Sequence, residues 1–230
     1  MKAPGKMLKT DQPPRDWIFD LDNTLYSETC NLFGQVEVRI KSFVAEFLNL
    51  ELEAAFKVQK QYFRDYGTTL RGLMECHDVD PVVYLDHVHD IDLDVVPPNP
   101  DLNKALQALP GRKIIFTNAD LGHAERVMER LGVSHHFEAV FDIVACDYVP
   151  KPDPAVYQAL VDQYDLEPQR TVMVEDMARN LKPAADMGMT TVWVRSNNDW
   201  GREGSDGDYV HHVADDLTAW LGSDHPVLTS

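Results

Sequence analysis

The sequence predicts an α/β fold, in which a doubly wound parallel sheet forms a core and carries an inserted all-helical segment. Short apolar runs recur along the chain, at Trp17–Asp20, Arg112–Thr117, Val140–Cys146, Thr171–Val174 and Thr190–Val194. Segments with apolar residues at helical spacing separate the later runs, at Leu121–Leu131, Pro154–Tyr164 and Ala178–Met187. Near-continuous apolar strands that alternate with helices are typical of a parallel sheet covered on both faces.

A third observation supports this fold, besides the apolar runs and the helical segments between them. The stretch between Trp17–Asp20 and Arg112–Thr117 has apolar residues at helical spacing and no strand-like pattern. One helical face collects the apolar residues Val36, Ile40, Phe43, Val44 and Phe47, and Pro81–Val88 is expected to be a further short helix. We expect a helical cap at residues 32–96, inserted into a core of residues 1–31 and 97–222, with a poorly ordered tail at 223–230. Its hinges are expected at Asn31–Gly34 and Val95–Pro100.

The chain is strongly acidic, with 21 Lys and Arg residues against 38 Asp and Glu residues and a formal net charge of −17. Such a surface repels nucleic acids and anionic membranes, so we expect neither as a partner. No apolar stretch approaches the ~18 residues of a membrane span. No apolar run follows the first lysines, so we expect that residues 1–10 are not a secretory signal. Three cysteines without short spacing are typical of a reducing compartment. We expect a cytoplasmic monomer or homodimer.

Polar side chains stand at the ends of four predicted strands. They are Asp20 and Asp22 after the first strand, Thr117 and Asn118 after the second, Lys151 after the third, and Glu175 and Asp176 after the fourth. Each group alone is also explained as a turn, a rigid loop between prolines or the first turn of a helix. Together they would meet at the carboxyl edge of the sheet, where doubly wound folds bind ligands.

The two aspartates after the first strand suit phosphoryl transfer through an aspartyl-phosphate. An Asp carboxylate is ionised at neutral pH and needs no base to activate it, so Asp20 is the expected nucleophile. Asp22 is the expected general acid and base, because it can protonate the leaving alcohol and later take a proton from the attacking water. The expected substrate is therefore a small phosphate monoester.

The other strand ends supply positive charge and cation ligands. Thr117 and the backbone N–H of Asn118 are expected to hold phosphate oxygens, and Lys151 to neutralise the phosphate and the nucleophile. Asp176 would complete a metal site with the Asp20 carboxylate and the Asp22 main-chain carbonyl. Its neighbour Glu175 is a further candidate ligand. Oxygen ligands of this kind favour Mg²⁺, which is the expected cofactor.

This set of motifs resembles that of the haloacid dehalogenase-like (HAD) superfamily. Asp20-Leu21-Asp22-Asn23-Thr24 resembles its first motif, Thr117-Asn118 its second, Lys151 its third and Glu175-Asp176 its fourth. The resemblance covers the core from about Asp16 to Val194, and it implies a phosphohydrolase with a mobile cap over its site. Dehalogenases of the superfamily lack an acid at the position of Asp22 and need no metal, which favours phosphate transfer here.

The cap is expected to determine the substrate. Within Tyr62–Leu73, Gly67 interrupts a helical pattern and is followed by two hydroxyls and an arginine. This stretch, with Asn23-Thr24-Leu25-Tyr26, resembles the pyrimidine 5′-nucleotidase branch, which hydrolyses nucleoside 5′-monophosphates such as UMP and CMP. The residues expected to contact substrate are Thr24, Asn118, Tyr66, Thr68 and Arg71. Stacking of Tyr26 or Tyr66 on a base is one interpretation. The other, which is favoured for each aromatic taken singly, is that Tyr62, Phe63 and Tyr66 pack in the core of the cap.

Several alternatives stay open at this point. Phosphoglycolate, a sugar phosphate or another small ester fits the same core motifs, and so does a sugar phosphomutase. A regulatory module that binds metal without turnover is a more distant alternative. A transition-metal site is a third alternative. The candidate ligands lack the spacing of a zinc site and are expected to be solvated or capping residues; they are Cys76, His77, His87, His89 and the pairs His135-His136 and His211-His212.

Overall fold

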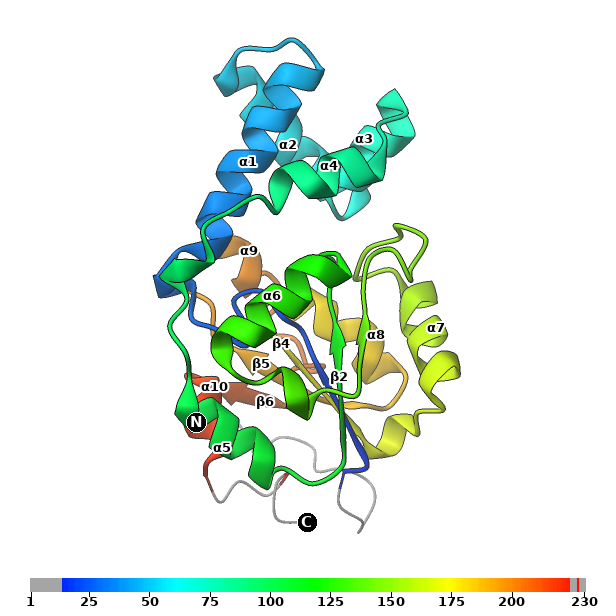
Figure 1. The fold of residues 1–230 in the computed structure, drawn as a ribbon. Coiled ribbons are helices and arrows are strands. Elements are labelled where there is room, and N and C mark those ends of the chain that lie inside the picture. The colour runs from blue at the N-terminus through cyan, green and yellow to red at the C-terminus, as the bar shows by residue number, and fades with distance from the viewer. Residues whose placement is uncertain (1–13, 224–226, 228–230) are drawn as a thin grey trace.

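The computed structural model describes residues 14–223 and Val227, and it contains one parallel sheet of six strands (Figure 1). The strands lie in the order β3-β2-β1-β4-β5-β6. Their bounds are β1 Asp16–Phe19, β2 Arg112–Phe116, β3 Ala139–Phe141, β4 Thr171–Glu175, β5 Thr190–Val194 and β6 His212–Ala214. The doubly wound parallel sheet predicted from the sequence is confirmed. Residues 1–13 of the expected core, and all of the expected tail except Ser223 and Val227, lie outside the described residues.

Alternate side chains of the strands build two apolar layers, one on each face of the sheet. Trp17 and Phe19 of β1 pack with α5 (Pro100–Ala108), α6 (Leu121–Leu131) and α10 (Leu217–Leu221). Ile18 points to the other face and packs with α7 (Pro154–Tyr164) and α8 (Leu181–Asp186). This two-residue alternation with burial on both sides explains why the strands are almost wholly apolar.

Four of the helices between β1 and β2 lie beyond the carboxyl ends of the strands (Figure 1), and their apolar cluster includes Ile143 of the core. Their bounds are α1 Leu32–Phe47, α2 Leu52–Tyr66, α3 Thr69–His77 and α4 Pro81–Val88. Short 3-10 turns, η1 Glu28–Cys30 and η2 Leu93–Val95, lie in the two connections to the sheet. We call α1–α4 the helical insertion. The helix expected at Pro81–Val88 is present with those bounds.

Not every element follows the sequence pattern. The strand expected over Val140–Cys146 is wrong in its length, because β3 ends at Phe141. Asp142 ends it, because its carboxylate accepts from the N–H groups of Ala145 and Leu121 at 2.9 Å and stabilises a turn. The expected helix at Ala178–Met187 begins as the 3-10 turn η5 (Ala178–Asn180) before α8. The remaining short elements are η3 Ser134–His136, η4 Pro168–Arg170 and α9 Asp199–Arg202.

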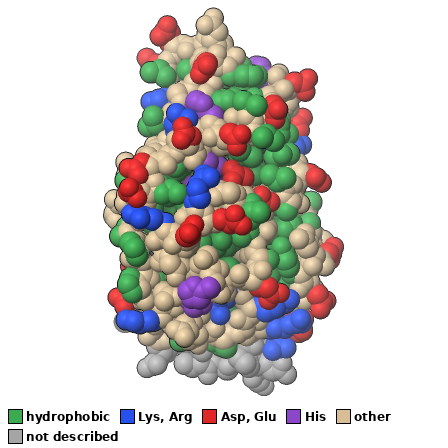
Figure 2. Space-filling view, in the orientation of Figure 1, with side chains coloured by type: hydrophobic (Ala, Val, Ile, Leu, Met, Phe, Trp, Pro, Cys, Tyr) green, Lys and Arg blue, Asp and Glu red, His purple; other side chains and the backbone are tan. Residues whose placement is uncertain are grey.

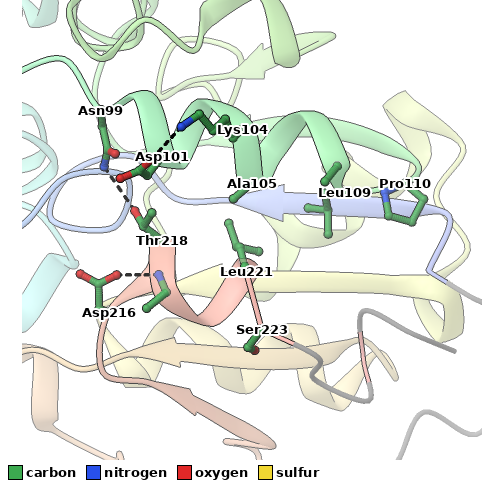
Figure 3. A pocket seen from close by; sticks show the side chains of 13 residues that line it. Asn99, Asp101, Lys104, Ala105, Leu109, Pro110, Asp216, Thr218, Leu221 and Ser223 are labelled. Atoms are coloured by element: carbon green, nitrogen blue, oxygen red, sulfur yellow. Dashed lines mark hydrogen bonds and ion pairs between the residues drawn. The ribbon is translucent and has the colours of Figure 1, made fainter.

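The surface mixes charges of both signs. Acidic side chains are spread over the face drawn in Figure 2, with lysines and arginines between them. A cavity of about 990 Å³ lies between α5 and α10, beside Asn99, Thr218 and Leu221 (Figure 3). None of the site residues expected from the sequence lines it. Among the described residues, no helix combines the length and apolar character needed to cross a membrane.

Candidate active site

The central strand β1 delivers Asp20 to the carboxyl edge of the sheet. Phe19 pairs with Ile115 on one side and Val174 on the other, so the next residue emerges between β2 and β4. The N–H of Asp20 donates to the carbonyl of Val174 at 2.9 Å, which extends the ladder by one residue. The chain order changes direction at β1, and ligands of doubly wound folds bind at this switch.

Lys151 connects the ends of three strands through its ammonium group. Its Nζ donates to Asp20 Oδ1 at 2.8 Å, to Glu175 Oε2 at 2.7 Å and to the carbonyl of Phe116 at 2.8 Å. Burial opposes the charge, but the two carboxylates outweigh it and hold the pKa of Lys151 above its usual value. The ammonium therefore stays charged, with its three donors directed at fixed acceptors.

Asp20, Glu175 and Asp176 form a buried acidic cluster, with one carboxylate oxygen of each within 4.8 Å of the others. Burial, followed by the charge of Glu175, raises the pKa of Asp20 to about 7. The same two causes raise the pKa of Asp176 well above its usual value. Three carboxylates face one lysine, so the cluster has an excess of negative charge that a divalent cation would neutralise.

Asp20 and Glu175 each have both carboxylate oxygens in hydrogen bonds. In Glu175, Oε2 accepts from Lys151 and Oε1 accepts from the N–H of Met177 at 3.1 Å. Asp20 Oδ2 accepts from the Thr24 hydroxyl at 2.8 Å, and the same hydroxyl accepts from the N–H of Asp176 at 3.1 Å. Thr24 thus connects the Asp20 carboxylate to the backbone of Asp176. Its hydroxyl, expected to contact substrate, is used in these two hydrogen bonds.

Asp22 is held at a single oxygen by two donors. Its Oδ1 accepts from the Tyr26 hydroxyl at 2.6 Å and from His123 Nε2 at 2.8 Å. Burial opposes ionisation of this carboxyl, but His123 and Tyr26 outweigh it and lower the pKa of Asp22. Tyr26 is itself 5% exposed and packs in the core, so its stacking on a substrate base is wrong.

Two further residues surround His123. The ring of His89, the residue that follows α4, stacks on the His123 ring with centroids 4.3 Å apart. His89 Nδ1 is hydrogen-bonded to Asp120 Oδ2, while Asp120 Oδ1 accepts from the N–H of His123 at 2.8 Å as the N-cap of α6. We call the segment from α4 to α5, residues 89–99, the return connection. Through His89 it contacts His123, the side chain that holds Asp22.

The residues after β2 also lie at this edge. Thr117 is buried, and its hydroxyl accepts from the N–H of Ala119 at 3.0 Å. The Asn118 side chain accepts from the N–H of Lys151 at 2.9 Å, which ties the lysine loop to the end of β2. Among the described residues, the backbone N–H of Asn118 donates to none, so it remains available to an anion.

The structure brings only part of the expected substrate contacts toward this edge. Gly67, between α2 and α3, lies against the lysine loop, and a Cβ there would sit 2.9 Å from Cγ of Pro150. The Thr68 hydroxyl is the N-cap of α3 and accepts from the N–H of Arg71 at 3.1 Å. Arg71 pairs with Glu75 at 2.5 Å, and the Tyr66 hydroxyl is 3.2 Å from Cys76 Sγ.

His123 and Asp120 are site residues that the sequence reasoning did not assign. It considered Tyr26 only for stacking on a base and His89 only as a solvated or capping residue. A signal for His123 exists in the sequence. It lies on the apolar face of Leu121–Leu131 with Ala124 and Val127, in the first turn after Asp120, and that turn begins where the second strand ends. A polar ring on a buried helix face beside a strand end needs a partner, and the nearest acids are those of the site.

Comparison with known proteins agrees with this geometry. The family model described as haloacid dehalogenase-like hydrolase matches residues 18–188. Phosphate metabolism protein 8 of Saccharomyces cerevisiae is 25% identical over 202 residues, which are 81% of this chain and 63% of the yeast protein. Glyceraldehyde 3-phosphate phosphatase of Methanocaldococcus jannaschii is 26% identical over 193 residues, 76% of this chain and 82% of that protein.

A solved structure supports the fold independently. CbbY from Rhodobacter sphaeroides in complex with phosphate superimposes with a TM-score of 0.62 at 15% identity, and the match covers 91% of this chain and 96% of that chain. At this identity the likeness concerns the fold alone. The coverage shows that the likeness in fold extends over most of both chains.

Proposed function

Because this chain belongs to the haloacid dehalogenase-like hydrolase family, we propose that it is a Mg²⁺-dependent phosphomonoester hydrolase that works through an aspartyl-phosphate on Asp20. The observation that carries the proposal is the environment of the Asp20 carboxylate. It is buried at the sheet's switch point, held by Lys151 at 2.8 Å and Thr24 at 2.8 Å, and adjacent to a second acid, Asp22, that can exchange protons. An activated carboxylate with a separate acid is what two-step phosphoryl transfer requires.

In the first step, an Asp20 oxygen attacks phosphorus and the bond from phosphorus to the leaving oxygen breaks. The pKa of Asp22, lowered in the free enzyme, rises when the negative charge of the phosphate is bound beside it. Asp22 is then protonated and donates its proton to the leaving oxygen, which departs as an alcohol. In the second step, water attacks the phosphorus of the aspartyl-phosphate while Asp22 takes a proton from it. The Asp20–phosphorus bond breaks and inorganic phosphate leaves. Lys151 and the N–H of Asn118 stabilise the charge on the phosphoryl oxygens.

The acidic cluster fits a magnesium ion by the chemistry of its donors, since Mg²⁺ prefers carboxylate oxygens and water. Asp20 and Asp176 would bind it directly with the Asp22 main-chain carbonyl. Glu175 is a further candidate ligand, since its two oxygens accept hydrogen bonds just as the two oxygens of Asp20 do. A bound divalent cation supplies charge neutralisation that lets an anionic nucleophile approach an anionic phosphate.

Nucleoside 5′-monophosphates, pyrimidine ones first, are the proposed substrates. The support is the segment around Gly67, which lies against Pro150 beside Lys151 and so brings the start of α3 to the site. The proposal includes the division into a core (1–31 and 97–222) and a cap (32–96), in a cytoplasmic enzyme. Arg71, paired with Glu75, would have to exchange that partner for a substrate group.

The test is phosphate release from UMP, CMP, AMP, phosphoglycolate and sugar phosphates, with Mg²⁺ and with EDTA. We expect activity to depend on Mg²⁺ and Asp20→Asn to abolish it while the thermal transition is retained. Undiminished release by Asp20→Asn would remove Asp20 as nucleophile. Equal rates on all esters would contradict the nucleotide proposal alone, and phosphoryl return to a sugar without free phosphate would identify a mutase.

A further inference from the structure

The geometry points to His123 as a positioning residue that, with Tyr26, anchors Oδ1 of Asp22 and leaves Oδ2 as the oxygen that exchanges a proton with substrate and water. The inference rests on the proposed function and adds a residue to it. Both donors reach the same atom, Tyr26 at 2.6 Å and His123 at 2.8 Å. Among the described residues, no hydrogen bond is made to Oδ2.

Burial fixes the position of the His123 ring. His123 is fully buried, and its Nε2 must carry the hydrogen because it faces a carboxylate oxygen. Its Nδ1 is buried without a hydrogen-bond partner, so Asp22 is the only polar contact of the ring among the described residues. A buried imidazole whose one polar contact is the proposed acid is better explained by alignment of that acid than by stability, because the unpaired nitrogen costs free energy.

The stack on His89 links this anchor to the helical insertion. His89 follows α4, is 8% exposed, and is held by Asp120 and by Arg126, which donates to its carbonyl at 3.0 Å. A shift of this return connection would move the surface on which His123 rests. The acid therefore has its final alignment only when the insertion is seated on the core.

Alignment of a general acid has a kinetic signature that separates it from a structural role. p-Nitrophenyl phosphate has a stable leaving group and needs little protonation, whereas glycerol 3-phosphate must leave as a protonated alcohol. The value of kcat/KM reports the first chemical step, in which Asp22 protonates the leaving oxygen. A positioned general acid contributes about 10²- to 10⁴-fold where protonation is needed, and loss of its alignment removes part of that.

The experiment compares kcat/KM for these two esters in the full chain with Mg²⁺. We expect His123→Leu to lower kcat/KM for glycerol 3-phosphate by about 10- to 100-fold and that for p-nitrophenyl phosphate by less than about threefold. His123→Gln, which keeps a donor, is expected to recover part of the loss. Tyr26→Phe keeps its ring packing, removes the second donor and should give the same pattern. His135→Gln, an exposed histidine, is the matched control.

Equal losses on both esters would overturn the proposal in favour of a structural role. A gain on glycerol 3-phosphate would also overturn it, since His123 would then restrain the acid. If the wild-type chain hydrolyses neither ester, the anchor is tested by NMR instead, and the proposed function fails only if every ester of the panel given above is also left intact. The His123 Nε2 proton should be protected from exchange in the wild type and in Asp20→Asn, and lose that protection in Asp22→Ala. Equal protection in all three would overturn the anchor.

Discussion

At the scale of single residues, Thr24 holds the two acids of the site together. Its hydroxyl donates to Asp20 Oδ2 and accepts from the N–H of Asp176. Thr24→Val keeps the shape and leaves that buried N–H without a partner, so we expect unfolding to require about 1–3 kcal/mol less free energy. Phosphate release should fall about tenfold or more. Chemical denaturation and steady-state assays measure the two effects, and the exposed Thr29→Val is the control. Unchanged stability would show that water replaces the hydroxyl.

The thiols give a residue-scale prediction about pH. Burial, followed by the charge of Asp142, raises the pKa of Cys146 to about 12. A raised pKa leaves less thiolate at a given pH, and at pH 8 only about one Cys146 in 10⁴ is ionised. A disulfide reagent at pH 8 should therefore modify the exposed Cys76 first and Cys146 only after denaturation. Peptide mapping identifies the labelled residue. Fast labelling of Cys146 in the native protein would contradict its burial.

At the scale of elements, the turn between α2 and α3 is a contact point with the core. Gly67 has φ of 84°, and an added Cβ would lie 2.9 Å from Cγ of Pro150. Gly132 has φ of 77°, and nothing lies within 4 Å of such a Cβ. Both Gly→Ala changes should cost about 1 kcal/mol of unfolding free energy through backbone strain. Only Gly67→Ala should also raise KM, because it pushes the turn away from the lysine loop. An equal KM in both variants would remove this contact from substrate binding.

The sequence predicts the regular elements well and the short ones poorly. Apolar strands such as Thr190–Val194, and the helix Leu121–Leu131 with its N-cap and terminal glycine, carry their own patterns. The three-residue strand β6 and the four-residue helix α9 do not, because tertiary contacts rather than local pattern stabilise such short elements. The early end of β3 depends on the capping by Asp142, which hydrophobicity does not reveal.

The same division holds for the site. Residues at strand ends, such as Asp20 and Glu175, were foreseeable because parallel strands place them at one edge. The contact between His123 and His89 was not foreseen, since it depends on how the segment after α4 packs against α6. The hydrogen-bond partners of Thr68 and Arg71 are local helix contacts that a loop pattern does not specify.

At the scale of the whole molecule, the helical insertion and the core meet through an aromatic and cationic contact. The Phe63 ring of α2 packs edge-to-face on Trp200 of α9, with centroids 5.2 Å apart. Arg179, three residues after Asp176, places its guanidinium 4.5 Å from the centre of the Phe63 ring. Arg64 adds a second cation over Trp200 at 5.0 Å. The contact therefore connects the insertion directly to the segment that follows the acidic cluster.

This contact should determine how firmly the insertion stays seated. An aromatic pair contributes about 0.5–1.5 kcal/mol and a cation–π contact about 0.5–2 kcal/mol, so Phe63→Leu removes roughly 1–3 kcal/mol of interface free energy. Most of that should favour an opened insertion over global unfolding, because the buried members of the insertion's apolar cluster all lie between Val36 and Val88 except Ile143 of the core. We expect faster amide exchange in α2 and α3, an increase in KM of several-fold and a thermal transition close to that of the wild type.

Phe47→Leu is the matched control, because Phe47 is 44% exposed and its ring stacks on Phe43 within the insertion's own apolar cluster. It should change neither the exchange rates nor KM. If Phe63→Leu lowered the thermal transition as far as a core substitution, the insertion and the core would unfold as one unit, and a separately moving cap would be excluded. If exchange accelerates while KM is unchanged, opening occurs without affecting substrate binding. His89, the residue that follows α4, stacks on His123, which holds Asp22. An opened insertion should therefore slow the turnover of glycerol 3-phosphate more than that of p-nitrophenyl phosphate.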